Sequence, residues 1–275
     1  MRDHYTLTVP ELAGLNVRYY CQNTPQLDDA RVFPPHVHDR LEFYVLIEGN
    51  ASFMVEEHLY PLMPGDVIVS RPNEIHNCIL NERTVHKHLC FWLESSSEFL
   101  LGDFLTGGEG RGALISPSAK EKERLASLYD EVCRAGEEER PHKQTYVMLE
   151  ILDILRQNLS NETRRLQLPP LLSTILEDVN RNFPYIHDLE YFTRTYFVSQ
   201  STLCRMFRKH LQTTPRLYLE SKRLAHSRRL LREGKSVLDA CYESGFSDYS
   251  NYIRLFKRRF SVTPGQYRSG DVWQE

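Results

Sequence analysis

Two stretches in the C-terminal third of the chain carry side chains suited to contact DNA. If each stretch is a helix, one face is apolar and the opposite face presents mainly arginine, lysine, asparagine, serine and threonine. Such groups match the base edges and phosphates of the DNA major groove. The candidate DNA-contacting residues are Ser201, Thr202, Cys204, Arg205, Arg208 and Lys209 in the first stretch and Tyr249, Ser250, Asn251, Arg254, Lys257 and Arg258 in the second.

A solvated helix face is the alternative interpretation of one such stretch, but two in register favour DNA binding. We expect Arg205 and Arg254 to contact bases or phosphates, while the uncharged members tune the sequence preference. The remaining basic side chains, Arg208, Lys209, Lys257 and Arg258, are expected to contact phosphates.

Three histidines and a glutamate form a second group, in the N-terminal half. His36, His38 and Glu42 lie within seven residues, and His76 follows later. Because alternate residues of a strand point the same way, the first two and, if the strand is regular, Glu42 share one face. His76 can reach that face from a partner strand.

Both DNA-contacting stretches belong to a pattern that occurs twice. Six positions are identical at a constant offset of 49 residues, from 197 to 246 onward. They are Phe197, Ser201, Arg205, Phe207, Pro215 and Tyr218 in the first copy and Phe246, Ser250, Arg254, Phe256, Pro264 and Tyr267 in the second. A repeat of this kind indicates a duplicated helical module.

Each copy is predicted to form a short helix, a tight turn and a second helix. Gly245 ends the short helix of the second copy, and Ser247 or Asp248 can cap the helix that follows. Thr214-Pro215 and Thr263-Pro264 each place a capping hydroxyl before a proline at the first position of a further helix.

The N-terminal part of the chain, from about Tyr5 to Glu94, is predicted to form short strands. Leu41–Ile47 and Asp66–Ser70 are rich in β-branched and aromatic residues, and turn residues such as Pro64-Gly65 separate them. Several strands without helices between them favour a small antiparallel barrel or sandwich.

Two amphipathic helices are expected after these strands. Leu125, Leu128 and Val132 mark the first, and the second has an apolar face wider than one contact requires, between Val147 and Leu159. We expect the second helix to mediate dimerisation, with burial within the chain as the alternative. Residues 161–170 are polar and end at two prolines, so they are predicted to be a linker.

Charge is distributed unevenly over the 275 residues, whose net charge is −3. Residues 169–275 contain 17 basic and 11 acidic side chains, a net charge of +6, which leaves −9 for the rest. A basic C-terminal half agrees with phosphate binding. The six cysteines are far apart and lack zinc-finger spacing, and no apolar run has the length of about 20 residues that a membrane helix needs. A cytoplasmic protein with reduced thiols is expected.

The C-terminal residues resemble the signature of AraC-type transcription regulators. The resemblance covers roughly the last hundred residues and is carried by Ala240-Cys241, Gly245-Phe246-Ser247-Asp248, Phe256-Lys257-Arg258, Thr263-Pro264 and Tyr267-Arg268. It implies two helix-turn-helix units joined by a long helix at about 215–233, with recognition helices in successive major grooves. The chain departs from the family at Thr193 and Cys241, where a small alanine is usual, and at Gln212 and Ser261, where glycine is frequent.

The N-terminal group resembles the paired motifs of the cupin barrel. The matching residues are His36, His38, Glu42 and Gly49, followed by Gly65, Pro72 and His76. In metal-binding cupins the three histidines and the glutamate hold the ion, and such a set suits Zn, Mn or Fe. Two other interpretations stay open, namely hydrogen bonding to a small effector and a purely structural role in the barrel core.

Together these observations predict an α+β protein of two domains. Residues 1–160 are expected to form a cupin-like antiparallel barrel with two helices, which binds an effector and dimerises, and residues 171–275 an all-α domain with two helix-turn-helix units. The predicted function is that of a DNA-binding transcription regulator, an activator under control of a small molecule such as a sugar, and not an enzyme. The alternative is a metal-dependent cupin enzyme or metal sensor fused to a DNA-binding domain. The expected partners are promoter DNA, the effector and a second copy of the chain, without a membrane.

Overall fold

The computed structural model describes residues 3–9, 15–24, 35–38, 40–80, 86–94, 98–106, 110–137, 140–159 and 164–270. The chain divides into two compact units. Residues 1–33 and 39–166 form the N-terminal unit, and residues 34–38 and 167–275 form the C-terminal unit. No helix in the described ranges has the length and apolar character needed to cross a membrane.

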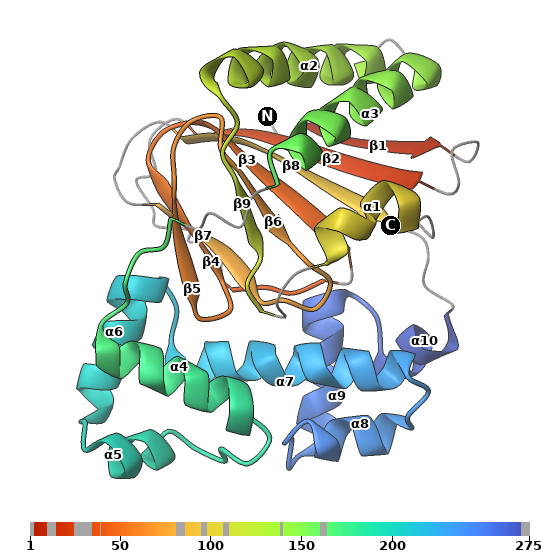
Figure 1. Ribbon diagram of the computed structural model, residues 1–275. Helices are drawn as coiled ribbons and strands as arrows, with labels where there is room; N and C mark the ends of the chain where they lie inside the picture. Colours follow the sequence, from red (N-terminus) through yellow and green to blue (C-terminus); the bar gives the residue numbers. More distant parts are fainter. Residues whose placement is uncertain are drawn as a thin grey trace. The chain divides into compact units, whose positions relative to one another are not determined.

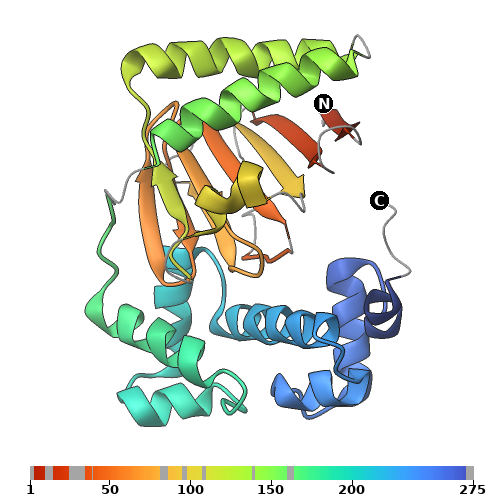
Figure 2. The same cartoon turned by 45° about the vertical axis from the view of Figure 1, so that its right-hand side comes forward.

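The N-terminal unit contains two antiparallel sheets, which confirms the predicted β architecture (Figures 1 and 2). The six-stranded sheet has the order β1 (Asp3–Val9), β2 (Leu15–Thr24), β8 (His86–Glu94), β3 (Leu41–Glu48), β6 (Val67–Ser70) and β9 (Ala113–Ile115). The three-stranded sheet has the order β5 (His58–Leu62), β4 (Ala51–Val55) and β7 (His76–Leu80).

Strand β3 of the six-stranded sheet has buried side chains on both faces, because successive residues point to opposite sides. On β3, Phe43 and Val45 pack on one side in a core shared with α1 (Glu98–Leu105), α2 (Ala119–Glu137) and α3 (Pro141–Gln157). Figure 2 shows α2 and α3 over this side of the sheet. Tyr44 and Leu46 point to the other side, into a core shared with the three-stranded sheet. Glu42, which precedes Tyr44 by two, is therefore expected on the side that faces the second sheet.

The apolar face predicted on the second amphipathic helix is largely buried within the N-terminal unit. Met148, Ile151 and Leu155 of α3 belong to the core that includes the six-stranded sheet. Tyr146, by contrast, is 72% exposed. Burial within the chain thus accounts for most of this face.

A buried carboxylate holds the end of the N-terminal unit. Asp66 accepts hydrogen bonds from Lys122 Nζ at 2.9 Å and from Arg164 Nη2 at 2.7 Å. Burial by itself would raise the pKa of Asp66, but the hydrogen bonds it accepts outweigh burial and lower it. Leu166 donates its backbone N–H to Leu59 O at 2.8 Å. Of the predicted linker, residues 164–166 therefore contact the sheet, and residues 161–163 lie outside the described ranges.

The C-terminal unit is helical, as predicted. Its helices are α4 (Pro170–Asn182), α5 (Glu190–Tyr196), α6 (Gln200–Leu211), α7 (Pro215–Arg232), α8 (Val237–Glu243), α9 (Tyr249–Phe260) and α10 (Pro264–Ser269). The pairs α5–α6 and α8–α9 are the two helix-turn-helix units, and α7 joins them (Figure 1). Thr214 and Thr263 cap α7 and α10 before prolines, and Asp248 caps α9, as the sequence predicts.

Three of the four departures from the family pattern have a clear structural setting. Gln212 and Ser261 follow α6 and α9 in the left-handed conformation, with φ of 49° and 62°. Glycine adopts this conformation most easily, which explains its frequency there in relatives. Cys241 is fully buried in the core around α8 and α9, where its small side chain replaces alanine.

Candidate functional site

The helices α6 and α9 present the predicted DNA-contacting faces. Their backs are anchored by Leu203 and Phe207 in α6 and by Tyr252 and Phe256 in α9, all fully buried. The opposite face of each helix, called its front, carries the predicted DNA contacts. The basic residues of the two fronts are exposed, namely Arg205, Arg208, Lys209, Arg254, Lys257 and Arg258. Burial of one face therefore fixes which side chains each helix offers to a partner.

Two basic side chains on α9 already have intramolecular partners. Arg254 Nη2 donates to Asn251 Oδ1 at 2.7 Å, and Arg258 Nη2 pairs with Glu220 Oε1 of α7 at 3.1 Å. At the start of α6, Ser199 Oγ instead lies 2.9 Å from both Ser201 Oγ and Thr202 Oγ1. The two fronts therefore differ in how their polar groups are held.

The turns of the two units are not equivalent, although both repeat copies contain a phenylalanine there. Phe197 ends α5 with a φ of 53° and is 94% exposed, whereas Phe246 is only 7% exposed and belongs to the core. In the second unit the left-handed residue is Gly245, one position earlier. Identity at the constant offset therefore does not give Phe197 and Phe246 the same surroundings, because three residues separate α5 from α6 but five separate α8 from α9.

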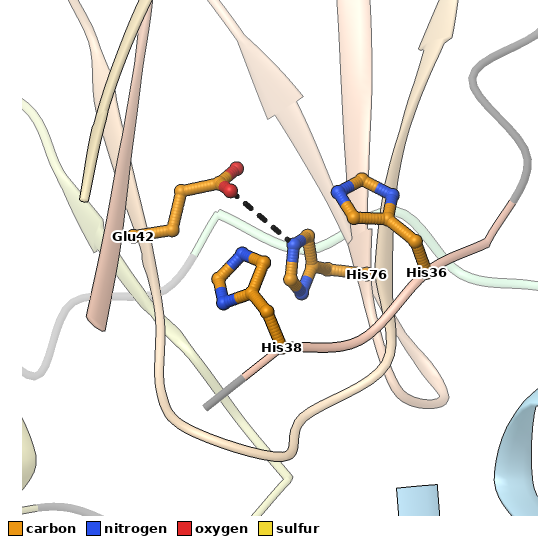
Figure 3. A group of neighbouring side chains, drawn as sticks. All are labelled: His36, His38, Glu42 and His76. Atoms are coloured by element: carbon orange, nitrogen blue, oxygen red, sulfur yellow. Dashed lines mark ion pairs between the residues drawn. The ribbon is translucent and has the colours of Figure 1, made fainter. Parts of the chain in front are cut away.

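In the N-terminal half, His36, His38, Glu42 and His76 come together, as the motif predicts. One ligand atom from each lies within 4.8 Å of the others, and the four side chains point toward one another (Figure 3). Glu42 belongs to β3 and His76 to β7, but the other two lie in the segment before β3. The expectation that they share a regular strand with Glu42 is wrong.

Hydrogen bonds orient Glu42 and His76. His76 Nδ1 lies 2.9 Å from Glu74 O, which directs Nε2 to Glu42 Oε2 at 3.5 Å. Trp92 Nε1 donates to the same carboxylate oxygen at 2.5 Å. Complete burial lowers the pKa of His76, but the Glu42 carboxylate outweighs burial, so that the pKa is raised.

The donor set fits a divalent transition metal. Zinc lies about 2.0–2.2 Å from histidine nitrogen and carboxylate oxygen, so its ligand atoms are roughly 3–4 Å apart. To reach this geometry, the most widely spaced of the four ligand atoms, up to 4.8 Å apart, need to approach one another by roughly 1–2 Å. A backbone carbonyl bonded to the second nitrogen of a histidine is also typical of metal ligands.

Four further polar residues between the sheets were not anticipated. Tyr44 Oη lies 2.7 Å from His86 Nε2 and donates to Cys78 Sγ at 3.1 Å, while the His88 ring stacks on the Tyr44 ring at 4.8 Å. Burial lowers the pKa of His86 to about 4 and that of His88 to about 3, so both rings are neutral at pH 7. The alternation of His86, His88, Cys90 and Trp92 along β8 is the sequence signal that could have found the two histidines, whereas Tyr44 and Cys78 lie on β3 and β7.

Comparison with known proteins gives two family matches. A model of the AraC-like ligand-binding domain matches residues 26–155, and a model of a helix-turn-helix domain matches residues 192–270. The transcriptional activator RhaS of an Enterobacter strain is 27% identical over 259 residues, with 90% of this chain and 91% of the relative covered. The activator RhaR of Mannheimia succiniciproducens is 23% identical over 245 residues, with 86% and 87% covered.

Among solved structures, ToxT of Vibrio cholerae is similar with a TM-score of 0.38 and 13% identity, covering 92% of this chain and 98% of ToxT. This similarity is too low to support further conclusions. A ligand-binding β unit followed by two helix-turn-helix units defines a DNA-binding transcription regulator with a ligand-binding domain. The chain belongs to the AraC-type transcription regulators.

Proposed function

We propose that the chain activates transcription by binding promoter DNA through α6 and α9 under control of a small molecule held between its two sheets. The main support is the pair of capped helices, each with a fully buried apolar back and an exposed basic front. The relatives named RhaS and RhaR are activators, which favours activation over repression. Action on promoter DNA implies a cytoplasmic location.

On DNA, Arg205 and Arg254 are the proposed base-reading residues. Arginine donates two parallel hydrogen bonds to guanine O6 and N7, so that each can discriminate a G·C pair. The neighbours that tune this preference are Ser201, Thr202, Cys204, Tyr249, Ser250 and Asn251. The phosphate contacts are Arg208, Lys209, Lys257 and Arg258, of which the last contributes least because Glu220 already neutralises it.

In the N-terminal unit, neutral hydrogen-bonding groups and aromatic faces support an uncharged, hydroxylated effector such as a sugar. Tyr44, His86 and His88 supply such groups without a positive charge. Glu42 and His76, together with His36 and His38 from the segment before β3, complete the proposed effector site. The neutral imidazoles of His86 and His88 supply no positive charge, and the imidazole of His76 is paired with the Glu42 carboxylate, which favours an uncharged ligand over a carboxylate.

A bound metal is the second candidate, because four ligand atoms of suitable type converge. An ion there would be held by His36, His38, Glu42 and His76, and would supply a Lewis acid to which an effector hydroxyl could bind. Glu74 O would keep His76 in the tautomer that presents Nε2. We propose a regulatory site without turnover in either case, in line with relatives that are regulators.

We also propose a homodimer. The exposed side of α2 and α3, where Tyr146 protrudes, is the surface left for a second copy once α3 has packed on the sheet. Two copies would read two half-sites, each spanning successive major grooves.

Selection of duplexes from a random DNA pool by the full-length chain tests the proposed function. A recovered consensus that spans two major grooves supports it, and equal binding of random and selected DNA contradicts it. Thermal shifts with uncharged sugars and with Zn²⁺, Mn²⁺ and Fe²⁺ then separate the two effector candidates. A shift that is lost in a His36→Ala/His38→Ala double variant supports the site, and exposed His142 and His187, changed to alanine together, give the matched control.

A further inference from the structure

The first turns of α6 and α9 are built in the same register. Ser199 Oγ accepts the backbone N–H of Thr202 at 3.1 Å, and Asp248 Oδ1 accepts that of Asn251 at 2.9 Å. Thr202 and Asn251 are therefore each the third residue of their helix. An arginine follows three positions later on the same face in both helices, which brings the two side chains within reach.

The two helices differ in what that third residue does. Asn251 Oδ1 accepts a hydrogen bond from Arg254 Nη2 at 2.7 Å. The Thr202 hydroxyl lies instead 2.9 Å from the capping Ser199 Oγ, and Arg205 makes no side-chain hydrogen bond or ion pair with residues that the structure describes. The arginine is therefore held in α9 and not in α6.

This difference matters for reading a base. A free arginine side chain populates many rotamers, whereas a bidentate contact to guanine requires one orientation of the guanidinium plane. The guanidinium has five N–H donors, so that one bond to Asn251 leaves four for DNA. An asparagine that holds the arginine beforehand reduces the conformational freedom lost on binding.

We propose that Asn251 is a positioning residue that holds Arg254 ready for a bidentate contact to guanine, so that α9 discriminates bases more strongly than α6. This rests on the proposed function. Thr202 cannot play the same part because its short hydroxyl is bound at the cap.

A double-mutant cycle on the full-length chain tests the proposal, with a DNA site selected by the wild type and fluorescence anisotropy as the readout. Arg254→Ala is expected to reduce discrimination at one G·C pair by roughly tenfold. Asn251→Ala should reduce discrimination at the same pair by about three- to fivefold, and should add nothing to Arg254→Ala. Asn251→Asp, which keeps an acceptor for Arg254 but cannot donate to a base, should retain the discrimination while binding all DNA more weakly.

The matched control is Asn182→Ala, which removes an exposed asparagine bonded to Asp178 on α4 and should leave discrimination unchanged. In α6, Thr202→Asn is expected to increase discrimination at the pair read by Arg205 by about threefold, an effect lost when Arg205→Ala is added. Circular dichroism confirms that each variant is folded.

Additive losses in the cycle, or an Asn251→Ala effect at a different base pair from that of Arg254→Ala, would overturn the positioning role. If Thr202→Asn leaves discrimination at the pair read by Arg205 unchanged, the claim that α6 lacks an acceptor at this position is overturned. A wild type that selects no sequence would instead contradict the proposed function, and the positioning role would fall with it.

Discussion

The units α5–α6 and α8–α9 begin their second helices alike, with a side-chain oxygen of Ser199 or Asp248 bonded to the third backbone N–H. They also bury matching aromatic residues, Phe207 and Phe256. The turns before these caps differ, since Phe197 protrudes from the first turn while Phe246 is buried within the second. The shared features are those that fix the backbone of a recognition helix.

The features that differ are those that face a partner. Lys209 and Arg258 occupy equivalent positions, but only Arg258 pairs with Glu220. Arg205 and Arg254 are likewise equivalent, but only Arg254 is held by Asn251. The two copies of the module therefore share their helix starts and their core, but their exposed DNA-contacting faces differ. This difference predicts that the two helix-turn-helix units discriminate between bases to different degrees.

The largest expected effect concerns the second turn. A Cβ at Gly245 would meet the Pro184 carbonyl and lie 2.6 Å from Pro184 Cα, and φ is +83°. Gly245→Ala should therefore lower the free energy of unfolding by about 3 kcal/mol or more, measured by urea denaturation. Gly234→Ala is the control, since Gly234 also has a positive φ but no atom near the added Cβ, and should cost about 1 kcal/mol. Equal costs would show that the packing against Pro184 is unimportant.

The second prediction compares the two arginines. Arg254→Ala should weaken binding to the selected site by about 1–3 kcal/mol, whereas Arg205→Ala should cost about 1 kcal/mol or less because Arg205 is not held before binding. Anisotropy titrations at one salt concentration measure both. A larger loss for Arg205→Ala would reverse the proposed order of the two units.

The third prediction concerns the exposed turn residue of the first unit. Phe197→Gly should leave stability unchanged or raise it by up to about 1 kcal/mol, because glycine relieves the left-handed strain that phenylalanine bears. Phe197→Ala keeps that strain, and should change stability by about 0.5 kcal/mol or less. A destabilising Phe197→Gly would mean that the aromatic ring packs in the folded protein after all.

The smallest expected effect lies in the salt dependence of DNA binding. A plot of the logarithm of the association constant for DNA against the logarithm of the salt concentration has a negative slope. Lys209→Ala should reduce the magnitude of this slope by about 0.9, the value for one lost phosphate contact. Arg258→Ala should reduce it by clearly less, because its charge is shared with Glu220 at 3.1 Å. Glu220→Ala removes the partner of Arg258 and serves as the comparison. If Glu220→Ala makes the salt dependence steeper but Arg258→Ala does not make it shallower, Arg258 does not contact a phosphate.

Local patterns allowed much of the fold to be predicted from the sequence. The caps Thr214 and Thr263 were predicted, and Asp248 was one of two candidates, because capping depends on neighbours within three residues. The buried stripe of α2, formed by Leu125, Leu128 and Val132, followed from helical periodicity. The exposure of Phe197 could not be predicted, because identity at a fixed offset does not reveal that the two turns differ in length.

Contacts between distant residues were the part that could not be predicted. The approach of His76 to Glu42 follows from a known motif, but the Tyr44, His86 and Cys78 contacts depend on strand pairing that no local pattern specifies. The bond between Arg164 and Asp66 joins residues 98 positions apart, so composition alone indicated a free linker. The Asn251–Arg254 bond is local, but the equivalent Thr202 hydroxyl contacts Ser199 instead, a choice of partner that the sequence does not specify.

The central claim is that the two helix-turn-helix units read DNA unequally. The most direct test is to replace every base pair of the selected site in turn and to measure the affinity of the wild-type chain for each duplex. We predict that replacements in the major groove read by α9 weaken binding by about 1–3 kcal/mol each, and that those in the groove read by α6 cost distinctly less. Equal costs in the two grooves, or larger costs under α6, would contradict the account.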